Sequence, residues 1–242
     1  MNKLFSYPFT LLYYCCFGSC LLIFHVLQWI ALNTFGYPTH KKVVDYMNFF
    51  INRCLNILGT CIRFHNKQDL PTNKPLIFVV NHQSTYDIPP LIWHLRKHHP
   101  KFISKKELGK GIPSVSFNLR HGGSVLIDRK NRTQALEKIS QFGKRLNENN
   151  HAAVIFPEGT RSRDGALRKF QKGGLITLMK SMPDALLVPV SVNNSWKLAR
   201  YNYFPMPLGV CINFTVHPPI AIDQFKKEQL IDTLHQTILN SL

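Results

Sequence analysis

The stretch IFVVNHQSTYDIPPL occupies residues 77–91 and determines how the elements around it are expected to fold. Its first four residues, 77–80, are apolar and predict a short buried strand. Two consecutive prolines at 89–90 are tolerated only in the first turn of a helix, so a helix should begin directly after Asp87, with Asp87 as its cap. His82 then follows the carboxyl end of a strand, which is the edge where open α/β sheets bind ligands.

His82 and Asp87 are five residues apart across this predicted strand-to-helix loop. Residues five apart on one continuous helix do not share a face, but across a tight loop the two side chains can meet. A carboxylate on one imidazole nitrogen fixes the tautomer and leaves the other nitrogen free to take a proton from a hydroxyl group. Taken alone, the pair is better explained as a loop histidine before a capping aspartate, because structural pairs of this kind are common.

Four segments of the chain resemble, in the same order, the four motifs of the glycerolipid acyltransferases. They are NHQSTYD at 81–87 (the motif His-x4-Asp), GSVLIDR at 123–129 with Arg132 beyond it, FPEGTRS at 156–162, and VPVSV at 188–192. The first and third motifs together are very specific, whereas the fourth alone carries no weight. The resemblance covers roughly residues 70–220 and is strongest to the 1-acylglycerol-3-phosphate acyltransferases, which acylate lysophosphatidate to phosphatidate.

The resemblance implies a catalytic pair, His82 and Asp87, and a set of residues that bind the substrate. The expected substrate-binding residues are Lys105, Arg129, Glu158, Gly159, Thr160 and Arg161. Arg161 offers a fork of donors that matches phosphate oxygens. Gly159 permits unusual backbone geometry and exposes amide groups, and Glu158 is expected to orient a glycerol hydroxyl or to hold Arg161. Without the resemblance, this segment would be read as an ordinary polar turn.

Further basic residues surround these motifs. Asp128 is expected to hold Arg129 or Arg132 in one rotamer, because a buried arginine needs such a partner. A role in substrate binding is favoured for Arg129. For Arg132, such a role and a merely exposed position at the start of a helix are equally good explanations. Four residues are expected to extend the basic surface rather than to touch the substrate: Arg163, Arg168, Lys169 and Lys172.

The composition of the 242-residue chain restricts its partners. The formal net charge of +17 implies an anionic partner, which could be nucleic acid, a membrane surface or a phosphorylated substrate. The paired aromatics and Cys/His fingers of nucleic-acid modules are missing from the sequence, so no nucleic-acid partner is expected. No metal-ligand spacing is present either. We therefore expect no metal and no cofactor, with acyl-CoA or acyl-carrier protein as the co-substrate.

The N-terminal region is apolar enough to contact a membrane. Residues 9–32 contain no Asp, Glu, Lys or Arg. As a helix they would reach about 36 Å, and the hydrocarbon core of a bilayer is about 30 Å thick, so the segment is long enough to span it. A buried core helix is the weaker alternative, and whether the segment spans or only dips into lipid stays open. Residues 43–64 predict an amphipathic helix that docks on the domain or lies in the lipid interface. Lys41 and Lys42 outnumber Lys3, which favours a membrane protein with its catalytic domain on the cytoplasmic face.

Strand and helix patterns alternate in the rest of the chain. Strands are expected at 77–81, 101–105, 123–128, 152–157, 186–192 and 210–216, and helices at 88–98, 131–149, 171–181 and 223–240. This alternation predicts an α/β fold, with a central mixed β-sheet flanked by helices. The expected division is an N-terminal membrane-associated helical hairpin over 1–66 and an acyltransferase α/β domain over 67–242.

The expected function is the transfer of a fatty acyl group from a thioester to the free hydroxyl of lysophosphatidate, giving phosphatidate in phospholipid synthesis. The expected partners are the membrane lipid substrate, an anionic membrane surface and, for one of the two donors, acyl-carrier protein. Two alternatives stay open. The acceptor could be another lysophospholipid or glycerol 3-phosphate, or the chain could be a non-catalytic protein that binds anionic lipid on the same scaffold.

Overall fold

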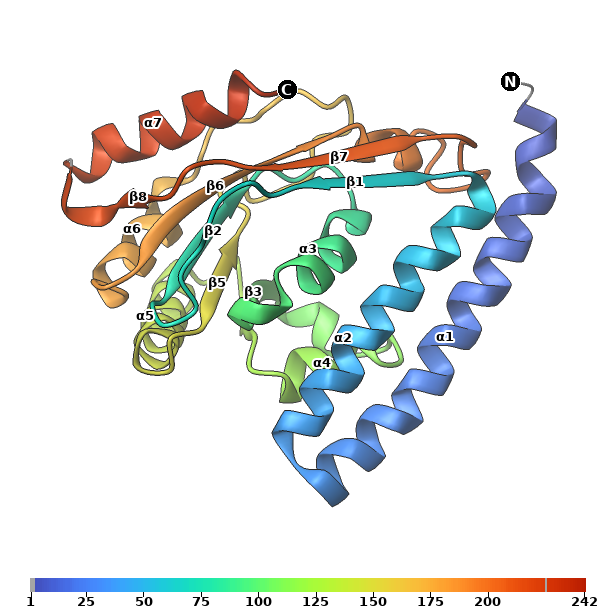
Figure 1. Ribbon diagram of the computed structural model, residues 1–242, viewed down its shortest axis with the longest axis horizontal. Coiled ribbons are helices and arrows are strands. Elements are labelled where there is room, and N and C mark those ends of the chain that lie inside the picture. Colours follow the sequence, from blue (N-terminus) through green and yellow to red (C-terminus); the bar gives the residue numbers. More distant parts are fainter. Residues whose placement is uncertain (1–2, 225) are drawn as a thin grey trace.

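A mixed β-sheet runs through residues 3–224 and 226–242, the part of the chain that the computed structural model describes (Figure 1). Its strands are β1 (Cys61–His65), β2 (Leu76–Val80), β3 (Lys101–Lys105), β4 (Val125–Ile127), β5 (Ala152–Ile155), β6 (Leu186–Asn193), β7 (Cys211–Val216) and β8 (Ile220–Ala221). They are ordered β1-β7-β6-β2-β5-β3-β4, and β8 pairs with β6. Only the pairs β6–β7 and β6–β8 are antiparallel. The predicted mixed sheet is confirmed.

Helices cover both faces of the sheet (Figure 1). They are α1 (Ser6–Phe35), α2 (Tyr37–Cys54), α3 (Ile88–His94), α4 (Val115–His121), α5 (Arg132–Glu148), α6 (Lys172–Ser181) and α7 (Lys227–Leu239). The helices α1 to α4 lie on one side of the sheet, and α5, α6 and α7 lie on the other. The flanking helices that the strand–helix alternation predicts are therefore present.

The central strand β2 is buried on both of its faces. Leu76, Phe78 and Val80 point into one hydrophobic core, with side chains from α1, α2 and α3. Ile77 and Val79 point into a second core, with side chains from α5, α6 and α7. A continuous apolar run is typical of a parallel strand with helices on both faces, and it fixes the end of β2 in the middle of one sheet edge.

Helix α1 has one apolar face that no other part of the described chain covers. Its span Lys3–Phe35 is long and apolar enough to cross a membrane. Tyr13 and Leu21 are buried in the protein core, whereas Leu22 and Trp29 are exposed. Gly36 turns the chain with a φ of 77°, and α2 then packs back along α1. The uncovered apolar face indicates membrane association.

Several predicted boundaries are wrong. The helix predicted over 43–64 ends at Cys54, and residues 61–65 instead form the edge strand β1, which pairs in parallel with β7. The turn between them needs a left-handed residue, which Gly59 supplies with a φ of 64°. The division at residue 66 stays a prediction, although β1 belongs to the sheet.

The remaining differences concern helix ends and short elements. The helix predicted over 88–98 ends at His94, because Leu95 leaves the helical conformation. The helix predicted over 223–240 begins at Lys227, and Phe225 within that range lies outside the described residues. The short elements α4 and β8 are not predicted at all, because neither contains enough residues to show a period.

Candidate active site

Five neighbouring strands end at one edge of the sheet and bring the site together. His82 follows β2, Lys105 ends β3, Arg129 follows β4, Glu158 follows β5 and Ser195 follows β6. Because β6, β2, β5, β3 and β4 are all parallel, their carboxyl ends share this edge. The strand order thus collects residues that are far apart in the sequence at the ligand-binding edge expected for an open α/β sheet.

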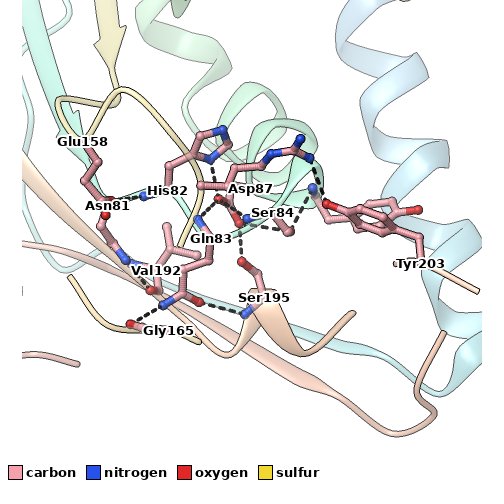
Figure 2. Close-up of polar contacts among 12 residues, drawn as sticks. Asn81, His82, Gln83, Ser84, Asp87, Glu158, Gly165, Val192, Ser195 and Tyr203 are labelled. Atoms are coloured by element: carbon pink, nitrogen blue, oxygen red, sulfur yellow. Dashed lines mark hydrogen bonds and ion pairs between the residues drawn. The ribbon is translucent and has the colours of Figure 1, made fainter. Parts of the chain in front are cut away.

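His82 and Asp87 form the centre of the site (Figure 2). His82 Nδ1 lies 2.8 Å from Asp87 Oδ2, so the predicted meeting of the two side chains is confirmed. The Asp87 side chain is fully buried, and the His82 side chain is 16% exposed. An ionised carboxylate can only accept, so Nδ1 carries the proton and Nε2 is left as an acceptor.

Asp87 is held by donors from the surrounding backbone and side chains. Its Oδ2 accepts from the backbone N–H groups of Gln83 at 2.7 Å and Ser84 at 2.9 Å, and its Oδ1 accepts from Ser195 Oγ. These bonds offset the cost of burying the charge. Helix α3 begins at Ile88 with Asp87 at its N-cap position, as predicted, but the Asp87 side chain makes no cap bond to that helix. Instead, Ser84 and Asp87 form a capping box around the short 3-10 turn Thr85–Asp87.

Ser195 is a site residue that sequence reasoning missed. It follows β6 in the short 3-10 segment Ser195–Ala199, and it is fully buried beside Asp87. Gln83 fixes its position, because Gln83 Oε1 accepts from the Ser195 backbone N–H at 3.1 Å. Asn81 adds a second link to β6, since it exchanges two hydrogen bonds with the Val192 backbone at 2.8 and 2.6 Å (Figure 2). The amide side chains of the first motif therefore attach the His82 loop to the end of β6.

Glu158 supports His82 from the opposite side. Its Oε1 accepts from the His82 backbone N–H at 2.6 Å, and its Oε2 accepts from the Arg168 N–H at 2.9 Å. The residue is only 5% exposed, and burial raises its pKa to about 7, although the two amide donors act in the opposite direction. The expected contact with Arg161 is wrong, because both carboxylate oxygens face the backbone. A role in substrate binding stays a prediction.

The aromatic ring of Phe156 lies against the imidazole of His82. The two ring centroids are 4.1 Å apart and the rings are nearly parallel, at 21°. The Ser162 N–H also donates to the His82 carbonyl at 2.7 Å. The segment after β5 therefore holds the His82 backbone at both its N–H and its carbonyl and packs Phe156 against its ring.

Some of the predicted phosphate-binding residues already have hydrogen-bond partners within the chain, and others are exposed. Arg129 donates to the Gly159 carbonyl, whereas Asp128 binds Lys106 at 2.5 Å. The predicted pairing of Asp128 with Arg129 or Arg132 is therefore wrong. Gly159 has a φ of 71°, and its N–H donates to the Phe156 carbonyl at 3.1 Å. The prediction that this amide is free to bind a ligand is therefore wrong. Lys105 and Thr160 are exposed.

Arg161 connects the site to helix α1. Its Nη1 donates to the Tyr203 hydroxyl at 3.0 Å, and the Tyr203 carbonyl accepts from the Tyr14 hydroxyl at 2.8 Å. The Met206 N–H donates to Thr10 Oγ1 at 2.9 Å on the same helix. The loop that carries Tyr203 and Met206 thus lies between Arg161 and α1.

Comparisons with known proteins agree with this geometry. A family model described as Acyltransferase matches residues 61–193, more than half of the chain. A 1-acyl-sn-glycerol-3-phosphate acyltransferase of Haemophilus influenzae is 26% identical over 223 residues, which cover 90% of this chain and 85% of that protein. One from Limnanthes douglasii is 28% identical over 163 residues, which cover 66% of this chain and 56% of that protein.

The fold also matches a solved structure. The crystal structure of the 1-acyl-sn-glycerophosphate acyltransferase PlsC from Thermotoga maritima superimposes with a TM-score of 0.83. The match covers 100% of this chain and 96% of that one, at 23% sequence identity. The two chains therefore share the whole fold, including the N-terminal helical pair. With the family model matched across β1 to β6 and the carboxyl-edge site in place, the chain belongs to the acyltransferase family.

Proposed function

We propose that the chain is a 1-acyl-sn-glycerol-3-phosphate acyltransferase, which moves a fatty acyl group from a thioester to the free hydroxyl of lysophosphatidate. The observation that carries the proposal is the 2.8 Å contact between His82 Nδ1 and the buried Asp87, at the carboxyl edge of the sheet. The names of the relatives from Haemophilus influenzae and Limnanthes douglasii support this choice of acceptor.

In the proposed reaction, His82 Nε2 takes the proton from the acceptor hydroxyl while the hydroxyl oxygen attacks the thioester carbonyl. Asp87 keeps the imidazole in the tautomer with a proton on Nδ1 and stabilises the imidazolium that forms. The tetrahedral intermediate then collapses, the carbon–sulfur bond breaks, and the thiolate leaves with the proton from His82. No covalent enzyme intermediate is needed, because a thiolate is a good leaving group.

The basic residues at the same edge hold the phosphate of the acceptor. Arg161 and Arg129 supply guanidinium groups, and Lys105 is an exposed ammonium at the end of β3. The exposed apolar face of α1 keeps the chain at the membrane, where the acceptor resides, and Lys41 and Lys42 support a catalytic domain on the cytoplasmic face. The donor is an acyl-CoA or an acyl-carrier protein.

The proposal is tested by thiol release from palmitoyl-CoA with detergent-solubilised protein. We expect release that depends on lysophosphatidate, yields phosphatidate and disappears in His82→Ala. Release with a different lysolipid, or with glycerol 3-phosphate, would replace the acceptor but keep the reaction. If neither palmitoyl-CoA nor palmitoyl-carrier protein is consumed with any acceptor, the chain is instead a lipid-binding protein on this scaffold.

A further inference from the structure

A cleft of about 410 Å³ lies between the start of the helical span Lys3–Phe35 and the chain that joins β6 to β7. We call it the α1–β7 cleft. Figure 1 shows this end of α1 beside the ends of β1 and β7. Among the described residues that line the cleft, none belongs to the four sequence motifs. The cleft is therefore separate from the candidate active site.

The charges that line this cleft have one sign. Lys3, Lys197 and Arg200 line it, and none of its described lining residues is acidic. The Tyr201 ring holds two of these cations, because Lys3 Nζ lies 4.6 Å and Arg200 Cζ 5.8 Å from its centroid. The salt bridges found in residues 3–224 and 226–242 involve none of the three cations. The cleft thus gathers positive charge without a protein carboxylate to balance it, which favours a bound anion.

The start of the helical span adds polar groups that suit an anion. Ser6 lines the cleft although the residue is only 6% exposed, and its hydroxyl can donate a hydrogen bond. The helical span begins at Lys3, so the partly positive end of the helix lies at the cleft. A phosphate group can use both of these features together with the ammonium and guanidinium donors.

An exposed apolar surface borders the cleft. Leu4 and Phe5 follow Lys3 directly, and both are exposed. Phe204 is exposed as well, and its ring contacts that of Tyr7 with the two centroids 5.5 Å apart. Cations and exposed apolar side chains therefore lie next to each other at this end of α1. A phospholipid in a membrane has the same two parts, a charged headgroup and apolar chains, whereas a free phosphate has only the first.

We propose that the α1–β7 cleft binds the headgroup of one anionic phospholipid of the surrounding membrane. Lys197 and Arg200 hold the phosphate from the side of the domain, and Lys3 and Ser6 hold it from the side of α1. The volume of the cleft lies within the range of about 300–1,000 Å³ that is typical of ligand pockets. A zwitterionic headgroup would bring its own cation into a cleft that offers no carboxylate, so the cleft selects an anionic lipid. This lipid is not a substrate, and the inference does not depend on the proposed acyl transfer.

Native mass spectrometry of the detergent-solubilised protein counts bound lipids directly. Dioleoylphosphatidylglycerol is the anionic probe, and dioleoylphosphatidylcholine is the zwitterionic one. We expect wild type to retain one phosphatidylglycerol per chain and the cleft variant Lys197→Gln/Arg200→Gln to bind it about 10-fold or more weakly. The variant Lys197→Arg/Arg200→Lys keeps both charges and should still retain the lipid.

A matched control variant tests whether net charge alone explains the binding. Lys144→Gln/Lys180→Gln removes the same charge from exposed positions on α5 and α6, on the other side of the sheet, and should bind phosphatidylglycerol as wild type does. The proposal is overturned if this control weakens binding as much as the cleft variant, or if phosphatidylcholine is retained equally well. It is also overturned if inorganic phosphate, titrated by calorimetry, binds as tightly as the lipid.

Sedimentation with vesicles separates this site from the contact of α1 with lipid. Vesicles of phosphatidylcholine alone should bind wild type and the cleft variant equally, because the apolar face of α1 is unchanged. Adding phosphatidylglycerol should strengthen the binding of wild type and of the control variant, and that of the cleft variant much less. An equal gain in all three proteins would mean that the whole surface senses the charge, which would overturn the site. Neither measurement uses acyl transfer, so a failure of the proposed reaction would leave this test intact.

Discussion

The two opposite edges of the sheet each hold a partly buried histidine against another ring, but a carboxylate bonds the histidine at only one of them. At the carboxyl edge, His82 stacks on Phe156 and its Nδ1 meets Asp87. At the amino edge, His99 stacks on His151 with ring centroids 4.5 Å apart, and its buried Nδ1 has no hydrogen-bond partner among the described residues. Ring packing is thus common to both edges, whereas an orienting carboxylate belongs to one.

The surroundings of His99 also determine how it titrates. Burial lowers the pKa of His99 to about 4, and the neighbouring His151, Lys41 and Lys101 act in the same direction. Lys101 is itself only 7% exposed, and burial lowers its pKa to about 8. A histidine in such surroundings stays neutral and serves packing, because no group there stabilises its charged form. A histidine becomes a useful base only where a fixed carboxylate on its other nitrogen stabilises the positive charge that it gains.

The largest expected effect comes from removing the base. His82→Ala should reduce acyl transfer by about 10³-fold or more, because a general base is worth about 10²–10⁴ in rate. Initial rates of thiol release measure this loss, and sedimentation with vesicles checks that membrane binding is retained. Activity within 10-fold of wild type, with the variant folded, would contradict the role of His82.

Removing the carboxylate charge should have the next largest effect. Asp87→Asn should lower kcat by about 10²-fold or more, because an amide no longer fixes the tautomer of His82 or stabilises its imidazolium. Since Asp87 also accepts several backbone hydrogen bonds, a thermal melt must accompany the kinetics. An unchanged kcat in folded protein would show that the carboxylate at the carboxyl edge does not contribute to catalysis.

A smaller effect should follow from Ser195→Ala, which removes a side-chain donor to the buried Asp87. Hydrogen bonds to charged groups are worth about 1.5–3 kcal/mol, so we expect a comparable loss of stability and a fall in kcat of about 10-fold. Ser191→Ala is the matched control, because Ser191 lies on β6, the strand that Ser195 follows, and its Oγ contacts His217 Nε2 at 2.7 Å. If both variants lose equal activity, Ser195 acts only through stability.

Some of the contacts behind these predictions could be predicted from the sequence, and others could not. The central strand and the His82–Asp87 pair follow from local signals, which are an apolar run, two prolines and a five-residue spacing. Ser195 is 108 residues from Asp87, and the partner of Asp128 is Lys106 rather than its neighbour Arg129. No local period records such partners, since the strand order of the folded sheet decides them.

The edge strand β1 shows the same limit for the fold. Its five residues follow an amphipathic helix with Gly59 as the one local stop signal, and their pairing partner β7 lies near the other end of the chain. Apolar spacing alone therefore extended the predicted helix through Phe64. The structure ends that helix early because parallel pairing with β7 satisfies the backbone of residues 61–65.

Glu158 offers a test by pH on the carboxyl edge. Its pKa is raised to about 7, so the folded chain keeps a proton that the unfolded chain has lost, between about pH 4.5 and 7. The free energy of unfolding should therefore fall as pH rises through this window, by up to about 1.4 kcal/mol per pH unit from this group. Chemical denaturation at several pH values, on wild type and Glu158→Gln, measures the difference. Equal slopes would show that Glu158 is ionised throughout.

The smallest effect on activity is expected at the amino edge. His99→Gln should leave kcat within about 2-fold of wild type, because no reacting group lies there. Its lowered pKa means that the unfolded chain binds the extra proton between about pH 4 and 6.5, so wild type loses stability as pH falls through that range. The variant should lose less stability between pH 6.5 and 4, as followed by thermal melts. A large loss of turnover in folded protein would show that His99 takes part in the reaction, contrary to this prediction.

The hydrogen bonds between α1 and the loop that carries Tyr203 make the apolar helix a component of the catalytic domain rather than a removable tether. Thr10 and Tyr14 hold this loop, and Tyr203 in turn holds Arg161. We therefore expect that a version shortened to begin at Gly36 would be no soluble catalyst, since it would lose the support of Arg161 together with its contact to lipid. Helix α1 and the domain that carries His82 are therefore not expected to work as independent modules.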